Sequence, residues 1–333
     1  MTPLAVLHSP AEWAAQFGAS QDDSQPDSVR GAVVSIGNFD GMHLGHQKIL
    51  RAVVERARTL HAVATVITFD PHPLKVLRPA QAPPLVCTLA QRLDGLASLG
   101  ISAALVLRFD LALAARSPEE FVHDFLVAQL RARAVLVGGN FRFGHKQAGN
   151  AAVLQEMGAK LGFAVEIVEP VISGGQVVSS TAVRRAVIEG RVTDATRLLG
   201  RPFALTGEIR RGEGRGSTIL FPTLNLAPEQ ELLPKTGVYA TETVAGGRLY
   251  RSATNVGFRP TFNGTHLSVE SHLFGFSERL TEGRLEVRFR ERLREERKFG
   301  GPEELRGQIA IDLEQAREFF RQLDQSQSTP QPA

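Results

Sequence analysis

The stretch Gly37-Asn38-Phe39-Asp40-Gly41-Met42-His43-Leu44-Gly45-His46 decides how the first half of the chain folds. An apolar run at residues 32–36 precedes it and predicts a buried strand, and apolar residues at helical spacing follow it over residues 49–57. The segment therefore predicts a strand, a tight glycine-rich turn and a helix. Such a turn directs backbone N–H groups and the positive end of a helix dipole at one point, where a phosphate binds well.

Two histidines in this stretch favour phosphate chemistry. His43 and His46 are three residues apart, so they share a face if the helix starts here. Both could donate hydrogen bonds to phosphate oxygens, and losing one such donor costs roughly 3 kcal/mol in a transition state. Gly45 between them would let a ligand approach the backbone closely. The plainer alternative is that each histidine is only a cap or a surface residue.

Length and composition indicate a globular protein of about two domains. The chain has 333 residues, 43% of them hydrophobic and 22% charged, with a net charge of +3. This balance does not require a basic nucleic-acid-binding face. Cys87 is the single cysteine, which excludes an intrachain disulfide and fits a reducing compartment. The sequence shows no signal peptide and no membrane-length apolar run. We therefore expect a cytoplasmic protein, a monomer or transient oligomer, without nucleic-acid or membrane partners.

The first half predicts an α/β domain with a Rossmann-like parallel sheet. Apolar runs alternate with helical patterns, an order that places helices on both faces of a parallel sheet. The runs cover residues 63–69, 103–109, 134–137 and 164–168, and the helical patterns cover residues 89–99, 117–130 and 150–161. Ligands of such sheets bind at the carboxyl ends of the strands. Three loops fall at that edge, at residues 37–46, 70–73 and 138–149.

The remaining polar motifs of this half have both structural and binding interpretations. Asp70-Pro71-His72-Pro73 forms an extended loop fixed by its prolines. The loop with Asn140, Phe141 and Phe143 is either a surface loop with buried aromatics or a binding wall. Ser179-Ser180-Thr181-Ala182-Val183-Arg184 caps a helix, and its hydroxyls with Arg184 could also clamp a triphosphate.

The second half predicts a small antiparallel barrel followed by a helix. A helical pattern over residues 181–199 stops at Gly200-Arg201-Pro202, where we place the domain boundary. Strand patterns with close turns follow at residues 237–244, 249–254, 267–274 and 285–289. An amphipathic helix starts at residue 302, and residues 324–333 are Gln/Ser/Pro-rich and expected to be disordered.

Two places in the predicted barrel could carry chemistry. Gly212 and Gly214 belong to a glycine-rich loop that could fold over phosphates. Thr223 and Asn225 lie on one side of an extended segment, and their oxygens suit Mg²⁺ shared with substrate phosphates. Glu270 lies in an otherwise apolar strand, where a glutamate is either solvent-facing or functional.

Together these motifs resemble the prokaryotic bifunctional riboflavin kinase/FMN adenylyltransferases. The resemblance rests on the 37–46 string, on Thr68-Phe69-Asp70-Pro71-His72-Pro73, on the 179–184 motif, on Phe221-Pro222-Thr223-Leu224-Asn225 and on Asn255-Val256-Gly257, all in the family's order. It covers nearly the whole chain. It implies riboflavin, FMN and ATP as substrates, with Mg²⁺ as cofactor and ATP as co-substrate.

The resemblance also implies domains and residue roles. The domains are an FMN adenylyltransferase domain at 1–186, a helical linker at 187–200, a riboflavin kinase domain at 201–323 and a tail at 324–333. The implied catalytic residues are Glu270 (as base), His43, His46 and Arg184. The implied ATP- or phosphate-binding residues are Gly37, Asn38, Phe39, Asp40, Gly45, Ser179, Ser180, Thr181, Gly212, Gly214, Thr223 and Asn225, the last pair also binding the metal. The implied flavin-binding residues are Asp70, Pro71, His72, Asn140, Phe141 and Phe143.

Three departures from the family pattern leave alternatives open. Leu220 stands where the family usually has Gly, Gly275 replaces a usual Asp, and Thr281-Glu282 lies near a usual Tyr-Gly. All three lie in the kinase half, so one alternative is an adenylyltransferase with a weakened kinase domain. Another is a non-enzymatic flavin-binding regulator or RNA-associated protein. His43, His46 and Arg184 argue against it, because binding alone does not need them.

Overall fold

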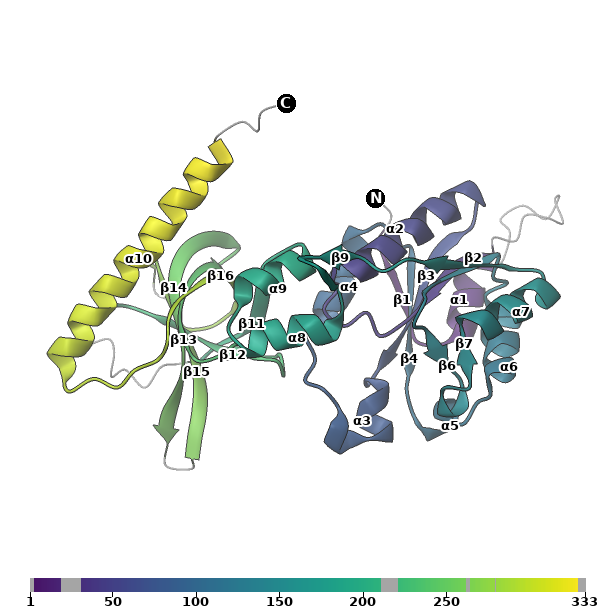
Figure 1. Ribbon diagram of the computed structural model, residues 1–333, viewed down its shortest axis with the longest axis horizontal. Helices are drawn as coiled ribbons and strands as arrows, with labels where there is room; N and C mark the ends of the chain where they lie inside the picture. The colour runs from purple at the N-terminus through teal and green to yellow at the C-terminus, as the bar shows by residue number, and fades with distance from the viewer. Residues whose placement is uncertain (1–2, 19–30, 211–220, 262–263, 279, 329–333) are drawn as a thin grey trace. The chain divides into compact units, whose positions relative to one another are not determined.

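The computed structural model describes residues 3–18, 31–210, 221–261, 264–278 and 280–328 of the chain. It divides into two compact units, Met1–Ser179 and Ser180–Ala333 (Figure 1). This division comes earlier than residue 186, where we expected the first domain to end. The reason is that α8 (Ser180–Ile188) packs with the second unit, where the Val187 carbonyl accepts the N–H of Lys235 at 3.3 Å.

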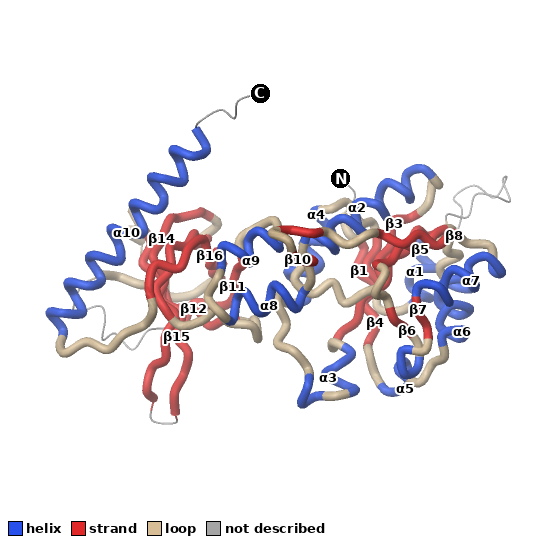
Figure 2. Tube along the Cα trace, viewed as in Figure 1, coloured by secondary structure: helices blue, strands red, loops and turns tan. Residues whose placement is uncertain are grey.

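The first unit is built on a six-stranded parallel sheet of order β1-β4-β3-β2-β5-β8 (Figure 2). Its strands are β1 (Ala5–Leu7), β2 (Ala32–Ile36), β3 (Val63–Asp70), β4 (Ala103–Arg108), β5 (Ala134–Gly138) and β8 (Ala164–Val168). Its helices are α1 (Pro10–Phe17), α2 (Leu44–Thr59), α3 (Pro73–Leu77), α4 (Leu89–Ser98), α5 (Leu111–Ala114), α6 (Pro118–Phe121), α7 (Ala151–Leu161) and the short η1 (Pro79–Gln81), η2 (Val122–Gln129) and η3 (His145–Gln147). Two hairpins complete it, β6 (Arg142–Phe143) with β7 (Gly149–Asn150) and β9 (Ile172–Ser173) with β10 (Gln176–Val177). The parallel sheet predicted from the sequence is confirmed.

Apolar side chains on both faces of this sheet explain its two helical layers. Val34 and Ile36 of β2 belong to one core cluster, with residues of α1, η2 and α7, whereas Val33 belongs to a second cluster with residues of α2 and α4. Alternate residues of a strand point to opposite faces, so a continuous apolar run is buried on both. The central strands therefore leave only their ends exposed for binding.

The second unit contains a closed antiparallel barrel of order β11-β12-β15-β14-β13-β16, as predicted. Its strands are β11 (Phe203–Arg210), β12 (Leu224–Pro228), β13 (Gly237–Ala245), β14 (Arg248–Thr261), β15 (Gly264–Leu273) and β16 (Arg284–Arg294). The barrel closes despite the departures at positions 275 and 281–282. Gly275 has a φ of +72° in the turn after β15, a conformation that favours glycine over aspartate.

The C-terminal helix is longer than we expected. Helix α10 (Pro302–Ser328) continues through residues 324–328, which we had predicted to be disordered. Asp324 accepts hydrogen bonds from Arg251 of β14, and this ion pair holds the last turns against the barrel. Nearer its start, the Asp312 carboxylate receives two bonds of 2.7 Å from Arg294.

Two helical patterns are interrupted in the structure. The pattern over 181–199 forms two helices, α8 and α9 (Val192–Leu199), because Gly190 between them adopts a φ of +77°. The pattern over 117–130 begins as an α-helix, with a capping box between Ser117 and Glu120, and continues as the π-helical η2. No helix in the described part of the chain is long and apolar enough to cross a membrane.

Candidate active sites

The turn between β2 and α2 is held by internal hydrogen bonds. The Gly37 N–H donates to the Ile67 carbonyl at 3.0 Å. The buried Asp40 carboxylate accepts the Val86 N–H at 2.9 Å and the Cys87 N–H at 3.2 Å. Gly41 has a φ of +82°, and its N–H donates to Cys87 Sγ at 3.1 Å. Asp40 therefore has a structural role, because its hydrogen bonds fasten the turn to the segment before α4.

His43 is the N-cap of α2, and this fixes its tautomer. Its Nδ1 accepts the His46 N–H at 3.3 Å. The proton of the neutral ring is therefore on Nε2, which is a donor. Gly45 allows this arrangement, because a Cβ there would lie 3.1 Å from the His43 ring. Glycine at position 45 therefore leaves room for the His43 ring. The close approach of a ligand to the Gly45 backbone stays a prediction.

His46 lies against His43 and Phe39. The two imidazoles are stacked with centroids 3.6 Å apart, and the Phe39 ring meets His46 edge-on at 5.2 Å. Burial first, then the charges of His43 and Arg92, hold the pKa of His46 well below its usual 6.5, so the ring is neutral at pH 7. Its Nδ1 is buried and has no hydrogen-bond partner among the described residues. A buried polar atom of this kind needs a partner from a water or a ligand.

Arg92 of α4 lies close enough for its charge to lower the pKa of His46. The sequence analysis did not assign this residue to the site. It is only 1% exposed, and its Nη1 donates to Thr68 Oγ1 and to the Phe69 carbonyl, both at 3.1 Å. Its Nε is buried without a partner, and no ion pair of Arg92 occurs among the described residues. The sequence signal was a basic residue on the apolar face of the 89–99 helix, one turn before Leu96.

The loop after β3 lies beside this turn, as expected. The Asn38 amide nitrogen is 3.1 Å from His72 Nε2, and Thr68 Oγ1 donates to the Asn38 carbonyl at 3.3 Å. His72 caps α3 by accepting the Leu74 N–H at its Nδ1. Asp70 and Pro71 are exposed next to it. The loops 37–46 and 70–73 therefore form one polar surface at the carboxyl edge of the sheet.

The third loop contributes one buried and one half-buried aromatic ring. Phe143 belongs to the core and packs 6.1 Å from Phe121, whereas Phe141 is stacked on Phe143 at 5.3 Å and is partly exposed. Asn140 is exposed. Asn140 and Phe141 are therefore better placed than Phe143 to meet a ligand.

The 179–184 motif begins α8, as predicted. Ser180, Thr181 and Arg184 lie on the first turns of this helix, and Ser179 precedes it. Thr181 is exposed, whereas Val183 is buried. The hydroxyls are thus at a helix N-terminus, where backbone N–H groups favour anions.

In the barrel, Asn225 and Glu270 lie directly opposite each other. Strand β12 pairs with β15 so that Asn225 faces Glu270, and β14 pairs with β15 so that Asn255 also faces Glu270. The Glu270 carboxylate accepts a hydrogen bond from Ser268 Oγ at 2.9 Å. Asn225, Glu270 and Asn255 thus form a row across three neighbouring strands. We had not assigned Asn255 to the site. Its role could not be read from the sequence, because only the β14–β15 register brings it there.

This row offers oxygen ligands suited to magnesium. Thr223 is exposed just before β12, two residues from Asn225 and on the same side of an extended chain. A hydroxyl and an amide oxygen fit an ion that keeps most of its other ligands from phosphates and water. No cluster of three His, Cys, Asp or Glu side chains suited to a metal occurs in the described ranges. The predicted residues Gly212 and Gly214, and also Leu220, lie outside the described residues.

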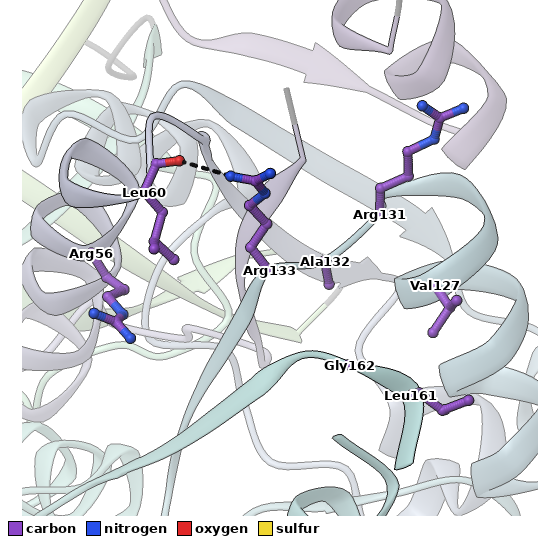
Figure 3. A pocket seen from close by; sticks show the side chains of 8 residues that line it. All are labelled: Arg56, Leu60, Val127, Arg131, Ala132, Arg133, Leu161 and Gly162. Atoms are coloured by element: carbon purple, nitrogen blue, oxygen red, sulfur yellow. Dashed lines mark hydrogen bonds between the residues drawn. The ribbon is translucent and has the colours of Figure 1, made fainter. Parts of the chain in front are cut away.

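A pocket of about 490 Å³ in the first unit lies at the opposite edge of the sheet (Figure 3). Helices α2 and α7 and the π-helical η2 all end there, and Arg56, Arg131 and Arg133 line it. Basic residues stabilise helix C-termini. Arg56 pairs with Glu166 at 2.8 Å, and Arg133 donates to the Leu60 carbonyl at 3.4 Å. Figure 3 shows the Arg56 and Arg131 side chains on different sides of the pocket, so they do not converge on a ligand.

Comparisons with known proteins cover both units. A family model described as FAD synthetase matches residues 25–182, and one described as riboflavin kinase matches residues 199–320. Proteins described as bifunctional riboflavin kinase/FMN adenylyltransferase are similar over most of the chain. That of Escherichia coli (strain K12) is 37% identical over 87% of this chain and 93% of its own. That of Pseudomonas fluorescens is 38% identical over 86% and 93%.

A solved structure has a similar fold over most of the chain. It is described as a macrolide-efflux protein from Streptococcus pneumoniae, and it matches with a TM-score of 0.80 at 27% identity. The match covers 94% of this chain and 98% of that chain.

Proposed function

Because the chain belongs to the bifunctional riboflavin kinase/FMN adenylyltransferases, we propose that each of its two reactions uses the polar residues described above in the matching unit. The enzyme phosphorylates riboflavin with ATP to give FMN and ADP, and it transfers AMP from ATP to FMN to give FAD and pyrophosphate. Two observations, one in each unit, carry the assignment of residues. The domain similar to FAD synthetase holds the stacked His43–His46 pair at a helix start, and the domain similar to riboflavin kinase holds Asn225 opposite Glu270.

In adenylyl transfer, we assign the polyphosphate of ATP to the start of α2. A phosphate oxygen of FMN attacks the α-phosphorus, the bond to the β-phosphate oxygen breaks, and pyrophosphate leaves. His43 donates from Nε2, and the neutral His46 lies beside it, so both can stabilise charge on the phosphates. The 179–184 motif is a separate phosphate-binding proposal, carried by Ser180, Thr181 and Arg184 on the first turns of α8. Asn140, Phe141 and the 70–73 loop would contact the flavin.

In phosphoryl transfer, we assign Glu270 as the general base. Its carboxylate, oriented by Ser268, takes the proton of the terminal ribityl hydroxyl as that oxygen attacks the γ-phosphorus and ADP leaves. Thr223 and Asn225 would hold Mg²⁺, which supplies positive charge to the transferring phosphates. Cytoplasmic location is a further proposal, supported by the single Cys87, which forms no intrachain disulfide.

The first test separates the two sites by substitution. His46→Ala is expected to lower FAD formation from supplied FMN about 100-fold or more, because a preorganised donor is lost. It should leave FMN formation from riboflavin within about twofold. Chromatographic separation of the flavins over time measures both rates in one preparation. Loss of both activities in a folded variant would contradict the assignment.

The reciprocal test uses the kinase base. Glu270→Gln keeps the size of the side chain and removes its basicity, so FMN formation should fall about 10²–10⁴-fold. FAD formation from supplied FMN should persist. A folded Glu270→Gln enzyme with normal kinase activity would show that another group accepts the proton, and would exclude the role that we give to Glu270.

A further inference from the structure

His272 connects the strand of the kinase base to the segment that precedes Asn225. It follows Glu270 by two residues on β15, so both side chains leave the same face of the strand. Continuing the β12–β15 register, in which Leu224 faces Ser271, places His272 opposite Thr223. His272 Nδ1 lies 3.0 Å from the carbonyl oxygen of Pro222.

This contact fixes the protonation of the ring. A carbonyl oxygen can only accept, so Nδ1 carries the proton and donates it to Pro222. Burial lowers the pKa of His272 below its usual 6.5, the bond to Pro222 opposes this shift, and the charge of Arg317 adds to it. The imidazole is therefore neutral at pH 7 and donates from a single, defined nitrogen.

The packing around the ring limits its movement. Phe221 meets the imidazole edge-on at 5.5 Å, and Phe274 meets it at 5.8 Å. Both phenylalanines also pack on the core cluster that α10 forms with the barrel. The Arg317 guanidinium of α10 lies 4.8 Å above the Phe274 ring. His272 is thus held on two sides while it bonds to Pro222.

Within the described parts of the chain, the segment that His272 holds has no strand pairing of its own. Residues 221–223 precede β12, and the pairing of β12 with β15 starts at Leu224. The side-chain bond to Pro222 takes the place of a backbone ladder bond at this point. Without the bond between His272 and Pro222, the backbone at Thr223 would still be linked to β12, but the direction of the Thr223 side chain would no longer be fixed.

We propose that His272 is a positioning residue of the kinase reaction, holding the Pro222 carbonyl so that Thr223 and Asn225 present their oxygens to Mg·ATP. The inference rests on the function proposed for Thr223 and Asn225. If the segment adopts the binding conformation only part of the time, the apparent affinity for Mg·ATP falls by that fraction. The chemistry at Glu270 is unchanged once Mg·ATP has bound.

Three substitutions in the full-length enzyme test this role. His272→Asn places an amide N–H close to the position of Nδ1, His272→Gln places it close to Nε2, and His272→Phe keeps a ring without a donor. We expect KM for Mg·ATP to rise about 10-fold in the Gln and Phe variants, equivalent to about 1.4 kcal/mol. We expect kcat and KM for riboflavin to change less than about twofold. The Asn variant should stay close to wild type.

The controls separate this inference from the proposed function. FAD formation from supplied FMN in each preparation reports on the first unit, and should not change.

Asn225→Ala tests the premise, the role of Asn225 in the kinase site, independently of His272. If it abolishes kinase activity while all three His272 variants keep a normal KM for Mg·ATP, the positioning role is wrong and the site stands. If Asn225→Ala has no effect, the site assignment fails first. Equal defects in Asn and Gln variants would also overturn the role, even if the Phe variant does not fold.

Discussion

At the scale of single residues, the first unit maintains a neutral imidazole next to a buried guanidinium. An unpaired buried charge costs several kcal/mol unless something compensates it. Arg92 has hydrogen-bond partners in Thr68 and Phe69 but no carboxylate among the described residues. Its field disfavours protonation of His46. The same positive charge would favour a polyphosphate at the start of α2.

We expect Arg92→Met to raise the pKa of His46, because one of the charges that depress it is removed. In the wild type, the unfolded chain protonates His46 near pH 6.5 and the folded chain does not, so stability of the first unit falls as the pH drops below about 6.5. Arg92→Met should weaken this pH dependence of stability, because the pKa of His46 moves back toward its unfolded value. NMR titration of the imidazoles measures the shift, with Arg92→Lys as the charge-retaining control. An unchanged His46 titration in folded Arg92→Met would contradict the prediction.

At the scale of elements, the barrel is specified by a row of buried hydroxyls. Thr241 of β13 lies 2.8 Å from Ser252 and 2.6 Å from Thr254 of β14, and Thr254 lies 2.7 Å from Ser271 of β15. Thr243 extends the row through Ser252 at 2.8 Å. All five are at most 1% exposed. A fully bonded polar row favours one strand register, because a slip would leave hydroxyls unpaired.

Thr254→Val should therefore destabilise the second unit by about 1–3 kcal/mol, because Thr241 and Ser271 each lose a partner in a buried site. Thr254→Ser keeps the hydroxyl and loses one methyl group, so it should cost only about 1 kcal/mol. Calorimetry of the full chain measures the two effects. Trp13, the single tryptophan, lies in the first unit and serves as the control, since its fluorescence transition should not move. A valine variant as stable as the serine variant would show that the row contributes nothing.

Helices, strands and turns with strong local sequence patterns could be predicted, whereas the contacts between elements distant in the sequence could not. The turn at 37–46, the helix start at Ser117 and the hairpin at 245–248 follow from local chemistry, and all appear in the structure. Strand β1 is only three residues long, too short to give a period. The sites of Arg92 and Asn255 depend on which elements pack together. Only the tertiary structure brings Asn255 opposite Glu270 or Arg92 near His46.

At the scale of the whole molecule, the chain combines two folding units whose cores are separate. The sheet clusters of the first unit contain only residues up to 168, whereas the cluster beneath α10 contains residues of the second unit. The proposed residues at the start of α2 and in the 70–73 loop belong to the first unit, and Thr223, Asn225 and Glu270 belong to the second. Products of the two reactions also differ, since pyrophosphate belongs to adenylyl transfer and ADP to phosphoryl transfer.

We therefore expect pyrophosphate and ADP, each with Mg²⁺, to stabilise different units. A ligand that binds only the folded state adds about 2.7 kcal/mol at 100 times its Kd. Pyrophosphate should raise the thermal transition seen by Trp13 fluorescence, because Trp13 is buried in the first unit. ADP should raise the other calorimetric transition. His46→Ala should reduce the pyrophosphate shift and Asn225→Ala the ADP shift, which ties each shift to its proposed site. A single transition that moves equally with both ligands would mean that the units unfold together and that each site depends on the integrity of both.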